Sequence, residues 1–231
     1  QDPLFEIAIQ MGAITAIVFL YRARLTQAFQ TVFSKPKGTG DASKGPQVNL
    51  LWLMLAAATP AALLGLFFQK QIVAWLFNPT TVGISLIVGG LLLWALEIWE
   101  DRRRLPDNKR LGLSDMSLRQ ALGIGLFQSL ALVPGTSRSG AMIAGGMVMG
   151  CRRTASAEFS FLVGIPILYG ASILHLMGDW ADIDGSARWI ELSVAAGVAF
   201  LSAWLVVKPF VTFLQNHSFR IFAWYRIAAG A

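Results

Sequence analysis

Long apolar runs separated by short polar segments make up most of the chain. The runs cover residues 4–21, 48–68, 81–99, 155–177 and 189–207. Each approaches or reaches the ~20 apolar residues that a helix needs to cross the ~30 Å hydrocarbon core of a bilayer. A last run, at 219–231, is too short to cross. The pattern predicts an all-helical protein that spans the membrane several times.

The apolar segment 118–150 differs from these runs because it is broken in the middle. Ser117 and Gln120 form the pattern of a capping box, and Pro134 with the glycine after it predicts the end of that helix. The first half is then about fifteen residues and roughly 22 Å long, and the second half, from about Ser139, is roughly 18 Å long. Neither half can cross the bilayer, so we expect a re-entrant hairpin of two half-helices.

Lysine and arginine are unevenly distributed over the polar connections. Residues 22–46 hold five and residues 100–117 hold five, whereas the connection 69–79 holds only Lys70. The positive-inside rule therefore places the two basic connections on the cytoplasmic side. The part at 26–46 is rich in glycine, proline and lysine, and it is predicted to be an irregular polar loop.

The composition agrees with the membrane class and excludes others. Hydrophobic residues make up 55% of the chain and charged residues 14%, which is far more apolar than a soluble domain. The net charge of +6 comes from basic residues beside apolar runs rather than from a basic stripe interleaved with aromatics, so no nucleic-acid partner is expected. A single cysteine excludes an internal disulfide.

A weak internal repeat relates the first and fifth runs. Glu6 precedes Gly12 by six residues, and Glu158 precedes Gly164 by the same spacing. The positive-inside count gives the two runs opposite directions, so the repeats would be inverted, as in membrane proteins with a site near the midplane. If both copies carry a hairpin, the first one would lie upstream of Gln1. We therefore expect the chain to be truncated at its N-terminus, and at its C-terminus as well.

The break in segment 118–150 carries the candidate chemistry. A charge at bilayer depth costs roughly 2.5 to 3.5 kcal/mol or more, so Arg138 needs a partner there, and a bound anion would be one. A helix beginning near Ser139 would present free N–H groups to a phosphate, and a guanidinium binds phosphate through two hydrogen bonds. The supporting residues are the glycines Gly135 and Gly140 and the hydroxyls of Thr136, Ser137 and Ser139. The alternative is that Arg138 pairs with a carboxylate or with helix-end carbonyls and that the glycines serve helix packing.

At these residues the chain resembles the undecaprenyl-diphosphate phosphatases of the bacitracin-resistance type. The resemblance extends over essentially all 231 residues, and the run 134–140 is its most specific part. It implies an enzyme of the bacterial cytoplasmic (inner) membrane that hydrolyses undecaprenyl diphosphate to undecaprenyl phosphate and inorganic phosphate. This reaction would recycle the lipid carrier for cell-wall synthesis and confer bacitracin resistance. The implied catalytic residues are Arg138, Ser137 and Ser139, and the implied substrate-binding residues are Gly135, Thr136, Gly140 and Gln128.

The chain departs from the family pattern in two places. The family's acidic pair and histidine belong before the first apolar run and are not in this sequence. The resemblance implies a divalent cation, Mg²⁺ or Ca²⁺, with ligands upstream of residue 1, and Glu158 is only a weak candidate ligand. The chain would then hold half of a catalytic site, and the alternative that it is an inactive fragment stays open. Met142 also stands where a threonine is common in the family.

Other reactive residues are expected to have structural roles. Glu6 and Glu158 lie near helix starts, where the helix dipole favours an acid. His175 is a lone histidine on an apolar face, and His217 lies in a short basic connection. Cys151 has no partner base in the sequence, so we expect it to pack.

We therefore expect a single transmembrane domain over residues 1–231, all-α, with inverted repeats and a re-entrant hairpin at 118–150. The expected function is hydrolysis of a polyprenyl diphosphate lipid in the bilayer. Broken helices and inverted repeats also occur in transporters, so a lipid-phosphate flippase that uses the same anion site without chemistry is the alternative. Whether the protein forms a homodimer stays open.

Overall fold

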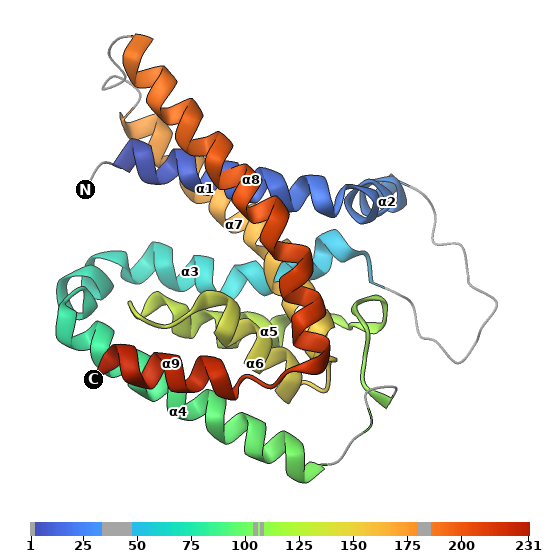
Figure 1. Ribbon diagram of the computed structural model, residues 1–231. Helices are drawn as coiled ribbons and strands as arrows, with labels where there is room; N and C mark the ends of the chain where they lie inside the picture. The colour runs from blue at the N-terminus through green and yellow to red at the C-terminus, as the bar shows by residue number, and fades with distance from the viewer. Residues whose placement is uncertain (1–2, 34–47, 104–105, 107–108, 180–185) are drawn as a thin grey trace.

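The computed structural model describes residues 3–33, 48–103, 106, 109–179 and 186–231, and it is helical over most of them (Figure 1). The long helices are α1 (Pro3–Leu20), α3 (Leu50–Leu76), α4 (Pro79–Arg103), α7 (Arg153–Asp179) and α8 (Ser186–Asn216). The short helices are α2 (Arg22–Phe33), α5 (Leu118–Ser129), α6 (Arg138–Val148) and α9 (Arg220–Gly230), with single 3₁₀ turns at Leu113–Asp115 and Leu130–Leu132. The side chain of His175 falls outside the described part.

In the part of the chain that the structure describes, four helices are long and apolar enough to cross a membrane: α3, α4, α7 and α8. A fifth crossing is formed if α1 and α2, which meet at 75°, are taken as one bent span. Large apolar side chains cover the outside of these helices; on α3, for example, Leu66, Phe67 and Trp75 are 71%, 74% and 76% exposed. So large an exposed apolar surface is unfavourable in water but not in lipid. The expectation of an all-helical, multi-pass membrane protein is confirmed.

The prediction of an irregular loop from residue 26 was wrong for its first part. Residues 22–33 form α2, whose Leu25 and Ala28 are buried at the spacing of one helix face. Asn49 secures this helix, because its Nδ2 donates to the carbonyl of Ala28 at 2.7 Å. The polar composition of residues 22–33 concealed an apolar pattern on one face of the helix. This face stabilises the helix only when it packs against α3. Residues 34–47 lie outside the described part of the chain.

The predicted connection at 69–79 was also wrong in length. Helix α3 continues through Lys70 to Leu76, and only Phe77 and Asn78 separate it from α4. The Asn78 side chain accepts a hydrogen bond from the backbone N–H of Thr81 at 2.8 Å and so caps the start of α4. The polar pair at residues 69 and 70 did not stop the helix, because neither glutamine nor lysine disfavours helical backbone.

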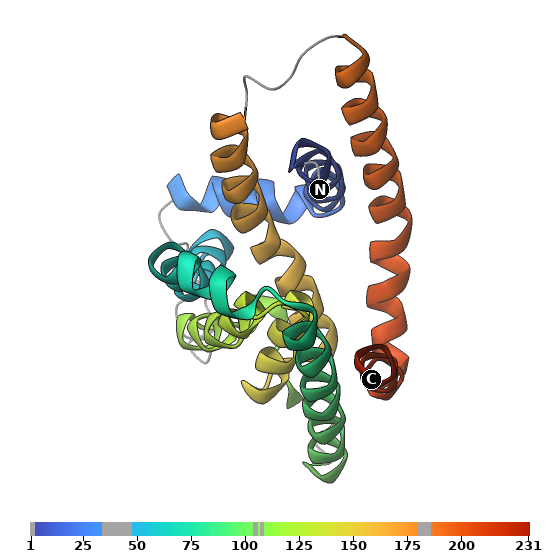
Figure 2. The same ribbon diagram turned by 90° about the vertical axis from the view of Figure 1, so that its left-hand side faces the viewer.

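The short helices α5 and α6 lie between two groups of longer helices. Helix α5 packs on α3, α6 packs on α7, and α5 and α6 pack on each other. Helix α4 contacts the other side of α6 and carries α9 along its length (Figure 1). Helix α8 runs along one side of the molecule next to α1 (Figure 2). The α5–α6 hairpin is therefore packed between other helices, while Leu118, Leu122, Leu126 and Leu130 leave one face of α5 exposed.

Both ends of the α5–α6 hairpin meet at one place. The N–H of Leu111 donates to the carbonyl of Gly150 at 3.1 Å, and the N–H of Arg152 donates back to the carbonyl of Leu111 at 2.9 Å. The predicted capping box is confirmed: Ser117 N–H donates to Gln120 Oε1 at 2.7 Å, and the N–H of Gln120 donates to Ser117 Oγ at 3.4 Å. The segment enters and leaves at the same end, which is the geometry of a re-entrant hairpin.

Candidate active site

The break between α5 and α6 is a tight turn that ends in a helix cap. Gly135 has a φ of 88°, a left-handed conformation that favours glycine, and a Cβ there would also lie 2.6 Å from the carbonyl oxygen of Val82. Ser137 is the N-cap of α6, because its Oγ accepts the N–H of Gly140 at 3.1 Å. The Oγ atoms of Ser137 and Ser139 lie 3.3 Å apart. The first N–H groups of α6 and these two hydroxyls therefore face the break, in the arrangement that binds anions.

Arg138 opens α6 and extends its side chain toward α7. Its guanidinium lies against Gly164, where an added Cβ would be 2.9 Å from Nη2 and 3.2 Å from Nη1. Nη1 is buried and has no hydrogen-bond partner. Within the described residues Arg138 forms no ion pair, so the alternative of a carboxylate partner finds no support there. Gly164, noticed in the sequence only as part of a repeat, provides the space that the guanidinium occupies.

Gln128 and Met142 show how deeply parts of the hairpin are buried. Gln128, on the last turn of α5, is 2% exposed; its Nε2 makes a long contact of 3.5 Å with the carbonyl of Ala57, and its Oε1 has no partner. Met142, one turn after Arg138, is fully buried in the core formed by α3, α5, α6 and α7. Met142 therefore fills this core with an apolar side chain and offers no hydroxyl there. Gln128 and Arg138 each bring an unpaired polar atom into the interior of an apolar protein, which calls for a partner.

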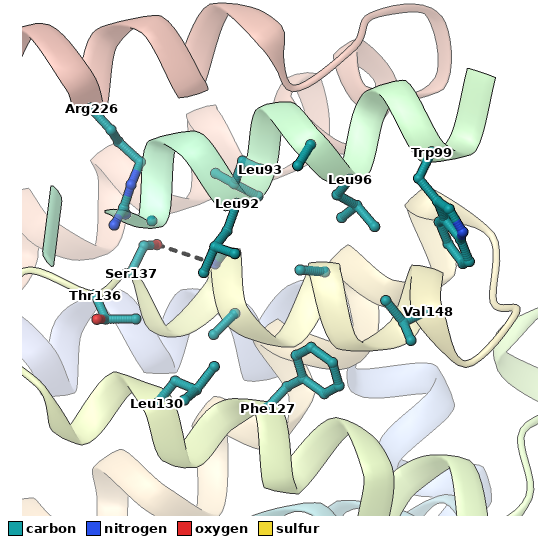
Figure 3. Close-up of a pocket in the computed structure, with 15 residues that line it drawn as sticks. Leu92, Leu93, Leu96, Trp99, Phe127, Leu130, Thr136, Ser137, Val148 and Arg226 are labelled. Carbon is teal, nitrogen blue, oxygen red and sulfur yellow. Dashed lines mark hydrogen bonds between the residues drawn. The ribbon is translucent and has the colours of Figure 1, made fainter. Parts of the chain in front are cut away.

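Three of the other predicted site residues line a cavity on the opposite side of α6. This cavity, about 310 Å³ in volume, separates α4 from α6 and is lined by Thr136, Ser137 and Gly140 but not by Arg138 (Figure 3). The structure thus divides the sequence motif between two faces. Arg138 faces α7, whereas Thr136, Ser137 and Gly140 line the cavity toward α4.

Arg226 on α9 reaches the break from the cavity side, and sequence reasoning gave it no role. It is 8% exposed, and its Nη2 donates to the carbonyls of Gly135 at 3.1 Å and Ser85 at 3.2 Å. The guanidinium crosses α4 at Gly89, where any Cβ would overlap it. Nε is buried without a partner. The sequence could have indicated a role for Arg226, because this arginine lies in a short apolar helix, where a charge is costly.

Glu158 does not stand free for a metal ion. Its Oε2 accepts a hydrogen bond from Nη1 of Arg24 at 2.5 Å, which ties α2 to α7. Glu6, its counterpart in the repeat, is exposed. The described residues contain no group of three or more acidic, histidine or cysteine side chains that could hold a metal ion together.

Cys151 closes the hairpin and is fully buried in the core. Burial raises the pKa of its thiol from 9.0 to about 11. Because only the thiolate reacts, we expect iodoacetamide at pH 8 to label Cys151 at least ~10-fold more slowly in the folded protein than after unfolding in detergent. Mass spectrometry of time-quenched samples measures both rates. Equal rates would contradict a packing role.

The chain matches known proteins over nearly its whole length. The family described as bacitracin resistance protein BacA matches residues 1–231. The undecaprenyl-diphosphatase of Psychrobacter arcticus is 41% identical over 228 residues, which are 98% of this chain and 78% of that protein. Undecaprenyl-diphosphatase 1 of Chromobacterium violaceum is 40% identical over 227 residues, with the same coverage. The resemblance carried by the glycine-rich break is confirmed, and the chain belongs to the bacitracin resistance protein BacA family.

Proposed function

We propose that this protein hydrolyses undecaprenyl diphosphate to undecaprenyl phosphate and inorganic phosphate in the bacterial cytoplasmic membrane. The observation that carries the proposal is Arg138: its Nη1 is buried without a partner at the start of α6, inside a membrane protein. A permanently charged group in that position is stabilised by a bound anion. The relatives quoted above are named undecaprenyl-diphosphatases, which supports a lipid diphosphate as that anion.

The break offers what transfer of a phosphoryl group requires. Water attacks the terminal phosphorus, the bond from that phosphorus to the bridging oxygen breaks, and negative charge is spread over the equatorial oxygens. The guanidinium of Arg138 and the first N–H groups of α6 stabilise this charge. Ser137 Oγ already accepts the N–H of Gly140, so its own hydrogen is available to a phosphate oxygen or to Ser139.

We also propose that the reaction uses a divalent cation, Mg²⁺ or Ca²⁺. The described residues do not by themselves form a site that fits this ion. Glu158, the weak candidate ligand taken from the sequence, is paired with Arg24, and no acidic cluster lies near the break within the described part. The requirement is measured by adding EDTA and then restoring each cation.

Phosphate release from undecaprenyl diphosphate tests the proposed function. The protein is purified in detergent, returned to liposomes and assayed with and without Mg²⁺ or Ca²⁺. Turnover that yields one phosphate and one undecaprenyl phosphate per substrate is the expected result. Binding of the lipid without release of phosphate would overturn the proposal, and movement of the bound lipid between leaflets would then favour the flippase.

A further inference from the structure

The cavity between α4 and α6 has a polar end and an apolar remainder. Arg226, Ser137 and Thr136 lie at one end, and Trp99 and Val148 lie at the other (Figure 3). Between them the walls carry leucines of α4 and small residues of α6, among them Leu96 and Ala144. The long axis of the cavity therefore follows α6 away from its N-terminus.

The volume of the cavity suits a short stretch of hydrocarbon. An apolar cavity of about 150 Å³ holds one benzene-sized molecule. At about 310 Å³ the cavity between α4 and α6 therefore has room for about a dozen carbon atoms, or two to three isoprene units. The rest of a long polyprenyl chain would lie in the surrounding bilayer.

We propose that this cavity binds the first two to three isoprene units of the lipid substrate and so orients its diphosphate toward the start of α6. This inference rests on the proposed function for the identity of the lipid. The occupant is thus an isoprenoid chain attached to an anion, rather than a free acyl chain or a second protein.

The polar end of the cavity supports an anionic head group there. Arg226 is more than nine-tenths buried, lines the cavity and has an Nε without a partner. The N-terminus of α6, capped by Ser137, opens to the same end. A diphosphate at the break would lie between Arg226 on the cavity side and Arg138 on the α7 side. A tail attached to it then has the apolar cavity directly beside it.

The physical role of the cavity is orientation rather than attraction. Lipid is as apolar as leucine, so a chain that leaves the bilayer for the cavity gains little from the hydrophobic effect. Walls on both sides do restrict the directions from which the head group approaches the break. Correct placement of the reacting group is what raises the rate of a bound substrate's reaction.

Filling the cavity tests the proposal. Ala144→Phe places a ring between α4 and α6, and Ala62→Phe makes the same change on the exposed face of α3 as the matched control. For undecaprenyl and farnesyl diphosphate we expect Ala144→Phe to raise KM about 10-fold or more, the scale at which pockets discriminate by shape. Dimethylallyl diphosphate, with one isoprene unit, should be affected much less. Ala62→Phe should behave as wild type. An unchanged KM for the long substrates in Ala144→Phe would overturn the proposal.

Photo-crosslinking tests the same site without any variant. A farnesyl diphosphate analogue with a diazirine on its third isoprene unit should label peptides that contain Trp99 or Val148. Labelling spread over the lipid-exposed helices α3 and α8, as a bilayer lipid would give, overturns the proposal. If wild-type protein releases no phosphate, the proposed function fails, yet the crosslinks still report whether an isoprenoid diphosphate occupies the cavity. If it does release phosphate and the crosslinks lie elsewhere, only the cavity assignment fails.

Discussion

Replacing Arg138 by alanine is expected to lower the rate of phosphate release from undecaprenyl diphosphate by about 10³-fold or more, which is the effect of removing an arginine that stabilises a transferred phosphoryl group. The same change should not destabilise the protein without substrate, because Nη1 of Arg138 has no partner to lose. A structural arginine would behave in the opposite way, since its removal would leave a buried partner unpaired. Phosphate release and the midpoint of thermal unfolding are measured on the same samples.

Two further variants separate the charge of Arg138 from its placement. Arg138→Lys keeps the charge but loses the planar, two-pronged group that matches phosphate, so we expect activity between wild type and alanine. Gly164→Ala keeps the arginine, but its new Cβ would lie 2.9 Å from Nη2 and displace the guanidinium. Its activity should fall toward that of the alanine variant. Arg119→Ala, on the exposed start of α5, serves as the control and should retain activity. Full activity in both Arg138→Ala and Gly164→Ala would contradict the assignment.

Replacing Glu97 by alanine should cause a large loss of stability, about 3 to 5 kcal/mol, because it removes a buried carboxylate that pairs with a partly buried guanidinium. Glu97 on α4 is 1% exposed, and its Oε1 accepts from Arg153 Nη2 at 2.8 Å and from the N–H of Phe219 at 2.9 Å. Arg153 also donates to the carbonyl of His217 at 2.8 Å. One carboxylate thus joins α4, α7 and the turn between α8 and α9. Without it, the buried backbone N–H of Phe219 loses its acceptor, and the partly buried guanidinium of Arg153 keeps only the carbonyl of His217.

Unfolding in mixed micelles with increasing SDS measures this loss. The matched control is Asp101→Ala, which removes an ion pair between Asp101 and Arg220 whose carboxylate is 61% exposed. An exposed pair contributes about 1 kcal/mol or less, so the control should unfold close to wild type. If the two variants unfold at the same SDS concentration, Glu97 does not hold these helices together.

Some of the site was visible in the sequence because its signals are local. The capping box at Ser117 and Gln120 and the turn after Pro134 depend on residues a few positions apart, and the structure has both. The α2 helix was missed because its polar residues conceal a one-sided pattern that needs α3 as a partner. Arg226 was given no role for a similar reason. It lies 91 residues from the carbonyl of Gly135 that it contacts, and no spacing in the sequence relates the two.

The sequence by itself determined the class of the protein, most of its long helices and the position of the break, because apolar length, helix caps and a proline-glycine stop act within one segment. Only the tertiary structure decided which way the residues of the break face. Arg138 turns toward α7 because Gly164 leaves room for it, and Arg226 reaches Gly135 because Gly89 does. The cavity between α4 and α6 likewise exists only where these helices meet. Such contacts depend on packing between distant segments, which local patterns do not record.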